Sequence, residues 1–234
     1  PGKFSQQVAA LRARPDCGVA YGRTRFSATD GTILADPFKW TGKALPELFP
    51  GLLVDRWWCT HTPLYRRSVT DAVGPWSSLR YSQDWEYDAR VGALGTRLVF
   101  CDRPVSVHRQ HEGARQTGHG KWLDPASRVT FFRALWSCAK SAGVEISSPE
   151  ARHFSRWVFA HARQCAANGE ESAARHLLEL ATEAAIGRSR IQCALFRTTA
   201  DLLGWRRTAL WSEALRRARG SVKGRDSLQQ SWMA

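Results

Sequence analysis

The sequence predicts an α/β domain followed by an all-α domain, and two observations support this. Before residue 110, short segments rich in β-branched and aromatic residues alternate with helical patterns, as in domains that mix strands with helices. After residue 124 no strand pattern occurs, and the pairs Asp124-Pro125 and Ser148-Pro149 each place a capping residue before a proline. That pair is a typical helix start, so we expect a run of helices from there.

The first elements follow from apolar spacing and turn residues. We expect a helix over 3–14 that ends before Pro15, since proline cannot continue a helix. Its expected inward face consists of Phe4, Val8 and Leu11. Residues 17–28 are predicted to be β, with Asp30-Gly31 turning the chain into a short strand at 32–34. Residues 35–61 contain three prolines and are expected to be irregular.

The middle of the chain alternates between strands and helices. A short strand is expected at 64–66, then a helix at 68–73 that ends at Gly74. A helix over 85–94 follows, with Gly95 as its terminating residue. Two strand pieces, 97–101 and 105–109, complete this part. These elements form the α/β region, for which we expect a domain over residues 1–120.

The second half of the sequence predicts five helices. They are expected to begin at Pro125, Pro149, about residue 170, after Gly187 and after Gly204. The hairpin at 154–185 carries small residues where two helices would approach closely, and it resembles a tetratricopeptide-type repeat. Antiparallel helices of other origin have the same pattern. We expect a helical domain over 124–220 and a flexible tail over 221–234.

Composition limits the possible classes of protein. The net charge is +13, and residues 188–225 contain ten Lys or Arg against Asp201 and Glu213. This excess of positive charge is typical of a segment that binds nucleic acid or anionic lipid. It is also typical of a solvated, arginine-rich helix face. No stretch of about 18 apolar residues is present. The six cysteines are dispersed, so we expect reduced thiols and a cytoplasmic protein rather than a disulfide framework.

Asp84 is the first candidate for chemistry. It lies where the helix at 85–94 is expected to begin. Aspartate is a good N-cap there, and that structural role is the simpler interpretation. A carboxylate at a helix start also stays ionised, because the helix dipole favours its charge. In a cleft it would be able to accept a proton from a hydroxyl, as a general base does. Glu86 and Asp88 are expected to face solvent or to pair with Arg90.

His111 is the second candidate. It closes the segment His108-Arg109-Gln110-His111, whose two histidines would lie on opposite faces of a strand. The segment is therefore no metal site by itself, although one imidazole would be able to complete a site made elsewhere. A surface histidine is the competing interpretation.

Three segments in order resemble the C-terminal half of family 2 glycosyltransferases. The first is Pro63-Leu64-Tyr65-Arg66-Arg67, followed by Asp71-Ala72-Val73-Gly74-Pro75-Trp76. The second is Gln83-Asp84-Trp85-Glu86-Tyr87-Asp88-Ala89-Arg90, and the third is Val107-His108-Arg109-Gln110-His111-Glu112-Gly113. The opening residues 1–22 also resemble the family segment that follows its metal-binding D-x-D strand. The resemblance covers about residues 1–118 and implies part of a GT-A-type domain.

The resemblance implies a role for each matching residue. Asp84 matches the base that deprotonates the acceptor hydroxyl, so that transfer from a nucleotide-diphospho-sugar inverts the anomeric carbon. His111 matches a position near the metal-diphosphate. Trp85 and the pair Trp57-Trp58 would line the acceptor cleft, with core packing as the alternative. Arg109 and Arg115 are candidates to compensate the diphosphate charge, with an exposed surface position as the alternative.

Two departures from the family pattern matter. Position 83 is Gln where the family usually has Glu, and no D-x-D motif is present. In the family, the nucleotide and a divalent cation, Mg²⁺ or Mn²⁺, bind mostly on the half that carries that motif. We therefore expect this chain to be a fragment that does not turn over alone. The competing hypotheses are a non-catalytic helical interaction scaffold with a degenerate transferase domain, and a basic nucleic-acid binder.

The expected partners follow from these hypotheses. They are a nucleotide-sugar donor and a glycan or lipid-linked acceptor. Any membrane contact is expected to be peripheral, at the inner face, through the arginine-rich helix at 205–219. We do not expect a nucleic-acid partner, because no nucleic-acid-binding motif accompanies the basic residues.

Overall fold

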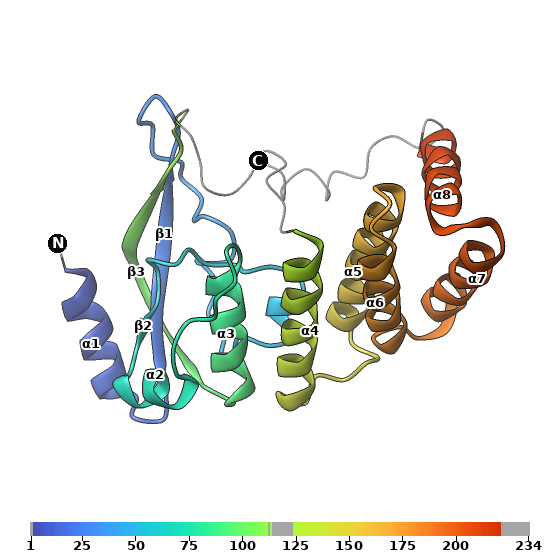
Figure 1. Ribbon diagram of the computed structural model, residues 1–234. Coiled ribbons are helices and arrows are strands. Elements are labelled where there is room, and N and C mark those ends of the chain that lie inside the picture. The colour runs from blue at the N-terminus through green and yellow to red at the C-terminus, as the bar shows by residue number, and fades with distance from the viewer. Residues whose placement is uncertain (1, 112, 114–123, 221–234) are drawn as a thin grey trace. The chain divides into compact units, whose positions relative to one another are not determined.

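The computed structural model describes residues 2–111, 113 and 124–220 (Figure 1). Its contacts divide the chain into two units. The first unit comprises residues 1–114 and 134–144, and the second comprises 115–133 and 145–234. The division runs through α4 (Pro125–Ser141), whereas the sequence placed the domain boundary between residues 120 and 124. The predicted tail over 221–234 lies outside the described residues.

The first unit is built around a small mixed sheet. Its described strands have the order β2–β1–β3, with β1 (Val19–Ser27) in the middle. β2 (Leu64–Tyr65) pairs with β1 antiparallel, and β3 (Leu98–Arg109) pairs with it parallel. In Figure 1, α1 (Lys3–Ala13) and α3 (Gln83–Ala93) lie on either side of this sheet. This is the α/β character that the sequence predicts.

The remaining elements of this unit are short. A 3₁₀ turn, η1, covers Gly51–Leu53 within the otherwise irregular segment before β2. Helix α2 covers Arg67–Val73 and ends at Gly74, whose φ of 78° suits glycine. The strand expected at 32–34 is reduced to a single bridge between Ser27 and Ile33.

The two pieces predicted at 97–101 and 105–109 form one continuous strand, β3. Its register against β1 shifts at Gly22 and Arg23, so that Gly22 faces Cys101 while Arg23 faces Pro104. The two intervening residues of β3 form a bulge. A Cβ on Gly22 would lie 2.7 Å from the Arg103 carbonyl oxygen, so the bulge requires glycine at this position.

The inward face of α1 differs from the prediction. Leu11 is buried, but Phe4 is 67% exposed and Val8 lies at the surface. Gln7 is completely buried instead, one turn before Leu11. Its amide donates hydrogen bonds to the carbonyls of Ala20 (2.8 Å) and Thr62 (3.0 Å). The helix therefore turns a polar side chain inward, and two backbone carbonyls satisfy its buried amide.

Both faces of β1 contribute to the core. On one face, Ala20 packs with Leu11 of α1, Cys17 and Cys101. On the other face, the Tyr21 ring contacts Trp57 in an edge-to-face arrangement with 5.1 Å between centroids. The sheet is thus covered on both sides, which places α3 and the segment before β2 together on the Tyr21 side.

The second unit is helical. It contains the first half of α4, then α5 (Pro149–Ala167), α6 (Glu171–Glu183), α7 (Gly187–Leu203) and α8 (Trp205–Gly220). Both predicted N-caps are confirmed: Asp124 accepts a hydrogen bond from the Ser127 amide, and Ser148 accepts one from the Ala151 amide. The alanines predicted at the α5–α6 contact are buried, namely Ala162, Ala166, Ala173 and Ala174. None of the described helices combines the length and the apolar character needed to span a bilayer.

Candidate functional site

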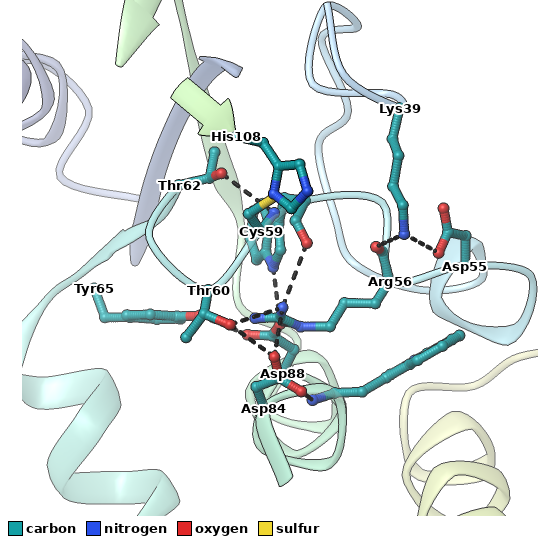
Figure 2. A network of polar contacts seen from close by, with 12 residues as sticks. Lys39, Asp55, Arg56, Cys59, Thr60, Thr62, Tyr65, Asp84, Asp88 and His108 are labelled. Atoms are coloured by element: carbon teal, nitrogen blue, oxygen red, sulfur yellow. Dashed lines mark hydrogen bonds and ion pairs between the residues drawn. The ribbon is translucent and has the colours of Figure 1, made fainter. Parts of the chain in front are cut away.

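A buried ion pair lies at the centre of the polar network in the first unit (Figure 2). The Arg56 Nε atom lies 2.7 Å from Asp88 Oδ2. Asp88 is completely buried and accepts two further hydrogen bonds, from Trp58 Nε1 (2.8 Å) and the Tyr65 hydroxyl (2.5 Å). Three donors, two from the segment before β2 and one from β2 itself, therefore converge on one carboxylate, which satisfies its charge in the interior.

Asp84 shares the same arginine. Its Oδ2 atom lies 2.8 Å from Arg56 Nη1 and accepts a hydrogen bond of 2.7 Å from the Thr60 hydroxyl. Its Oδ1 atom accepts a hydrogen bond from the Trp85 amide. Unlike Asp88, the Asp84 side chain is 30% exposed. The guanidinium thus joins one buried carboxylate to one that solvent reaches.

Helix geometry explains why both carboxylates meet one guanidinium. Asp84 and Asp88 are four residues apart in α3, and residues at this spacing lie on one face of a helix. Helix α3 begins at Gln83 after Ser82, whose φ of 59° is left-handed. Asp84 therefore lies in the first turn rather than at the predicted N-cap. The helix dipole favours its negative charge there.

Burial and charge shift the pKa values of the network. Burial alone would lower the pKa of Arg56. The Asp88 and Asp84 charges raise it by more than burial lowers it, so the net pKa is raised and the guanidinium stays charged. Burial raises the pKa of Asp88, opposed by Arg56 and by the hydrogen bonds from Tyr65 and Trp58. Burial and the neighbouring Asp88 charge raise the pKa of Tyr65 well above its ordinary value, which keeps its hydroxyl a donor.

A second polar cluster lies beside this network (Figure 2). Cys59 Sγ lies 3.4 Å from His108 Nδ1, and Lys39 Nζ lies 2.8 Å from Asp55 Oδ1. Burial raises the pKa of the Cys59 thiol to about 11. The thiolate is the nucleophilic form of cysteine, so this Cys–His pair does not have the electrostatics of a cysteine nucleophile.

The expected acceptor-cleft tryptophans occupy different environments. Trp57 and Trp58 are buried, with 4.6 Å between their ring centroids, and they pack around Tyr21. This corrects the expectation that they line a cleft, because rings packed in the core have no face left for a ligand. Trp85 is half-buried at the start of α3 and donates from Nε1 to the Leu52 carbonyl.

The candidates at the end of β3 are exposed rather than buried. Arg109 is the last residue of β3 and is exposed, and His111 is exposed two residues later. Arg115 lies outside the described residues. His108 points into the cluster with Cys59, as Figure 2 shows, while its neighbours Val107 and Arg109 are exposed. This alternation is what a strand imposes on its side chains.

Sequence reasoning missed two central residues. Arg56 received no role, and Asp88 was expected to face solvent or to pair with Arg90. That expectation is wrong for Asp88 and correct for Glu86, whose carboxylate lies 2.7 Å from Arg90 Nε. The four-residue spacing of Asp84 and Asp88 was an available signal for a shared partner. Nothing in the sequence indicated that the partner would come from a loop 28 residues earlier.

The described residues contain no group of three His, Cys, Asp or Glu side chains able to hold a metal ion. Comparison with models of protein families, with curated proteins and with solved structures finds no match to this chain.

Proposed function

We propose that this chain contributes the acceptor side of an inverting, GT-A-type glycosyltransferase, with Asp84 as the general base. The proposal rests on the resemblance of residues 1–118 to family 2 glycosyltransferases. One observation supports it most directly: Asp84 is the carboxylate of the Arg56 network that solvent reaches, whereas Asp88 is sealed in the interior. A base must reach its substrate, and of the two only Asp84 is able to do so.

The network suits an ionised base. Arg56 and Thr60 both hold Oδ2 of Asp84, so the carboxylate is fixed in one orientation before an acceptor arrives. A side chain fixed in this way needs no reordering during reaction. The Arg56 guanidinium also supplies a positive counter-charge 2.8 Å from this carboxylate.

In the proposed reaction, an acceptor hydroxyl gives its proton to Asp84 as its oxygen attacks the anomeric carbon of a nucleotide-diphospho-sugar. The bond to the diphosphate breaks on the opposite face, and the nucleotide diphosphate leaves with the bonding electrons. The configuration at the anomeric carbon is therefore inverted. Trp85, adjacent to the base, would contact the sugar ring of a glycan or lipid-linked acceptor.

The resemblance also implies a divalent cation, Mg²⁺ or Mn²⁺. His111 would supply one ligand, and Arg109 and Arg115 would offset diphosphate charge. The described residues do not by themselves supply a ligand set for such an ion. In the proposed reaction Asp84 carries the proton transfer.

The test compares two aspartate variants of the protein expressed from its whole gene. Release of nucleotide diphosphate is measured against a panel of uridine- and guanosine-diphospho-sugars with saccharide acceptors. Asp84→Asn is expected to lower the rate by at least about a hundredfold. The control is Asp36→Asn, an exposed aspartate of the same unit, which should leave the rate unchanged. Wild-type rates in Asp84→Asn, or no release with any donor, would overturn the proposal.

A further inference from the structure

Helix α7 has apolar residues on two opposite faces. One face is buried and contains Cys193, Phe196 and Ala200. The other is exposed and contains Ile191, Leu195 and Leu202. The exposed residues are spaced four and seven apart, so they form one stripe along the helix. The buried face accounts for how α7 packs within its unit, which leaves the exposed stripe without a structural role in the described residues.

Helix α8 continues this pattern. It begins directly after Gly204, the residue that ends α7, and it is anchored by buried Trp205, Thr208 and Ala209. The Trp205 ring lies edge-on to Phe196 of α7, with 6.0 Å between centroids. The solvent side of α8 carries Leu210, Trp211 and Leu215. We call these six side chains, three from each helix, the α7–α8 surface.

The exposure of these six side chains is unusual. It ranges from 47% for Leu210 to 78% for Leu202. Single exposed apolar residues are ordinary in soluble proteins, whereas an exposed apolar stripe along a helix indicates an interaction surface.

The two helices also carry an excess of positive charge. Up to residue 217 their basic residues are Arg188, Arg190, Arg197, Arg206, Arg207, Arg216 and Arg217, and their acidic residues are Asp201 and Glu213. Both acids are already paired: Asp201 lies 3.0 Å from Arg175 Nη1, and Glu213 lies 2.5 Å from Arg217 Nη2. The charge that remains is therefore strongly positive.

We propose that the α7–α8 surface binds an anionic lipid bilayer. Leucine, isoleucine and tryptophan inserted at the headgroup boundary, with arginines beside them, are the composition of an interfacial amphipathic helix. Anionic headgroups attract the arginines, and the acyl region accepts the apolar side chains without a shaped pocket. The surface fits nucleic acid less well, because a polyphosphate backbone offers no apolar groups for exposed leucines to contact. This inference is independent of glycosyl transfer.

The experiment measures partition of the full chain to sedimented vesicles, so it does not depend on activity. One set of vesicles is phosphatidylcholine alone, and the other is phosphatidylcholine with an equal amount of phosphatidylglycerol. Binding is expected only, or far more strongly, with phosphatidylglycerol. The double variant Leu195→Ser/Leu202→Ser, and separately Trp211→Ser/Leu215→Ser, should each lower the partition coefficient by roughly tenfold or more.

The matched control is Leu34→Ser/Leu94→Ser, which removes two comparably exposed leucines from the first unit. It should bind as the unmodified chain does. Arg206→Gln/Arg207→Gln should weaken binding by roughly fivefold per arginine and flatten its salt dependence.

Three results would overturn the proposal. The first is no sedimentation with phosphatidylglycerol vesicles at low salt. The second is an equal loss of binding in the control variant. The third is a concentration-dependent dimer that the α7 or α8 variants abolish, which would assign the surface to a second copy of the chain. Circular dichroism of each variant distinguishes lost binding from lost helix.

Discussion

The Arg56 guanidinium lies 2.7 Å from the fully buried Asp88 carboxylate and connects it to Asp84 at the edge of solvent. Removing one partner of a buried ion pair leaves an uncompensated charge, and this costs more than the pair contributes. The Arg56–Asp88 pair therefore controls the stability of the first unit and the position of its candidate base at the same time.

Arg56→Met should lower the free energy of unfolding by about 3–5 kcal/mol, because Asp88 loses its counter-charge in the interior. The double variant Arg56→Met/Asp88→Leu should recover much of this loss. Urea denaturation of the two variants measures both values. The control is Arg23→Gln, which breaks an exposed pair with Asp102 and should cost less than about 1 kcal/mol. Equal losses in Arg56→Met and Arg23→Gln would contradict this prediction.

Tyr65→Phe should destabilise the protein by about 1–2 kcal/mol, since one donor to the buried Asp88 carboxylate disappears. Tyr81→Phe is the matched change at a half-buried tyrosine of the same unit and should be nearly neutral. The denaturant midpoints of the two variants, compared at constant slope, measure both changes in stability. If Tyr65→Phe left the free energy of unfolding unchanged, the Asp88 carboxylate would not depend on this hydroxyl.

Gly22→Ala should cost about 2 kcal/mol by crowding. The added Cβ would meet the carbonyl oxygens of Arg103 at 2.7 Å and Cys101 at 2.8 Å, both on the bulged strand β3. Gly31→Ala separates crowding from backbone strain, because Gly31 has a φ of 87° and no atom within 4 Å of its Cβ position. That variant should cost about 1 kcal/mol. A Gly22→Ala loss no greater than that of Gly31→Ala would refute the requirement for glycine at the bulge.

His161 should make the helical unit sensitive to acid. Burial, helped by the nearby Arg128 charge, lowers the pKa of His161 from 6.5 to about 3. The folded state therefore keeps this imidazole neutral while the unfolded chain protonates it. The contribution to stability is complete above pH 6.5 and is lost as the pH falls towards 3, at roughly 1.4 kcal/mol per pH unit.

Two measurements check the His161 prediction. NMR titration should show the His161 ring still neutral well below pH 6.5. Denaturation at several pH values should show a shallower loss of stability in His161→Gln than in His176→Gln. Parallel pH profiles for the two variants would rule out His161 as the cause of acid sensitivity.

Local signals in the sequence predicted much of the secondary structure. Asp124 and Ser148 cap their helices as expected, because capping depends only on residues three positions apart. Gly74 and Gly95 follow the ends of α2 and α3 with positive φ, which is a local property of glycine. The α5–α6 hairpin likewise followed from its small residues, whose alanines are buried.

The tertiary structure decided which polar groups are buried. Phe4 was expected inside and is exposed, while Gln7 is buried because its amide meets the Ala20 and Thr62 carbonyls, which are distant in sequence. Trp57 and Trp58 became core residues because β1 presents Tyr21 to them. Asp88 is buried because Arg56, Trp58 and Tyr65 converge on it. Spacing along the chain encodes the helix face that Asp84 and Asp88 share, but only the folded chain brings Arg56 to that face.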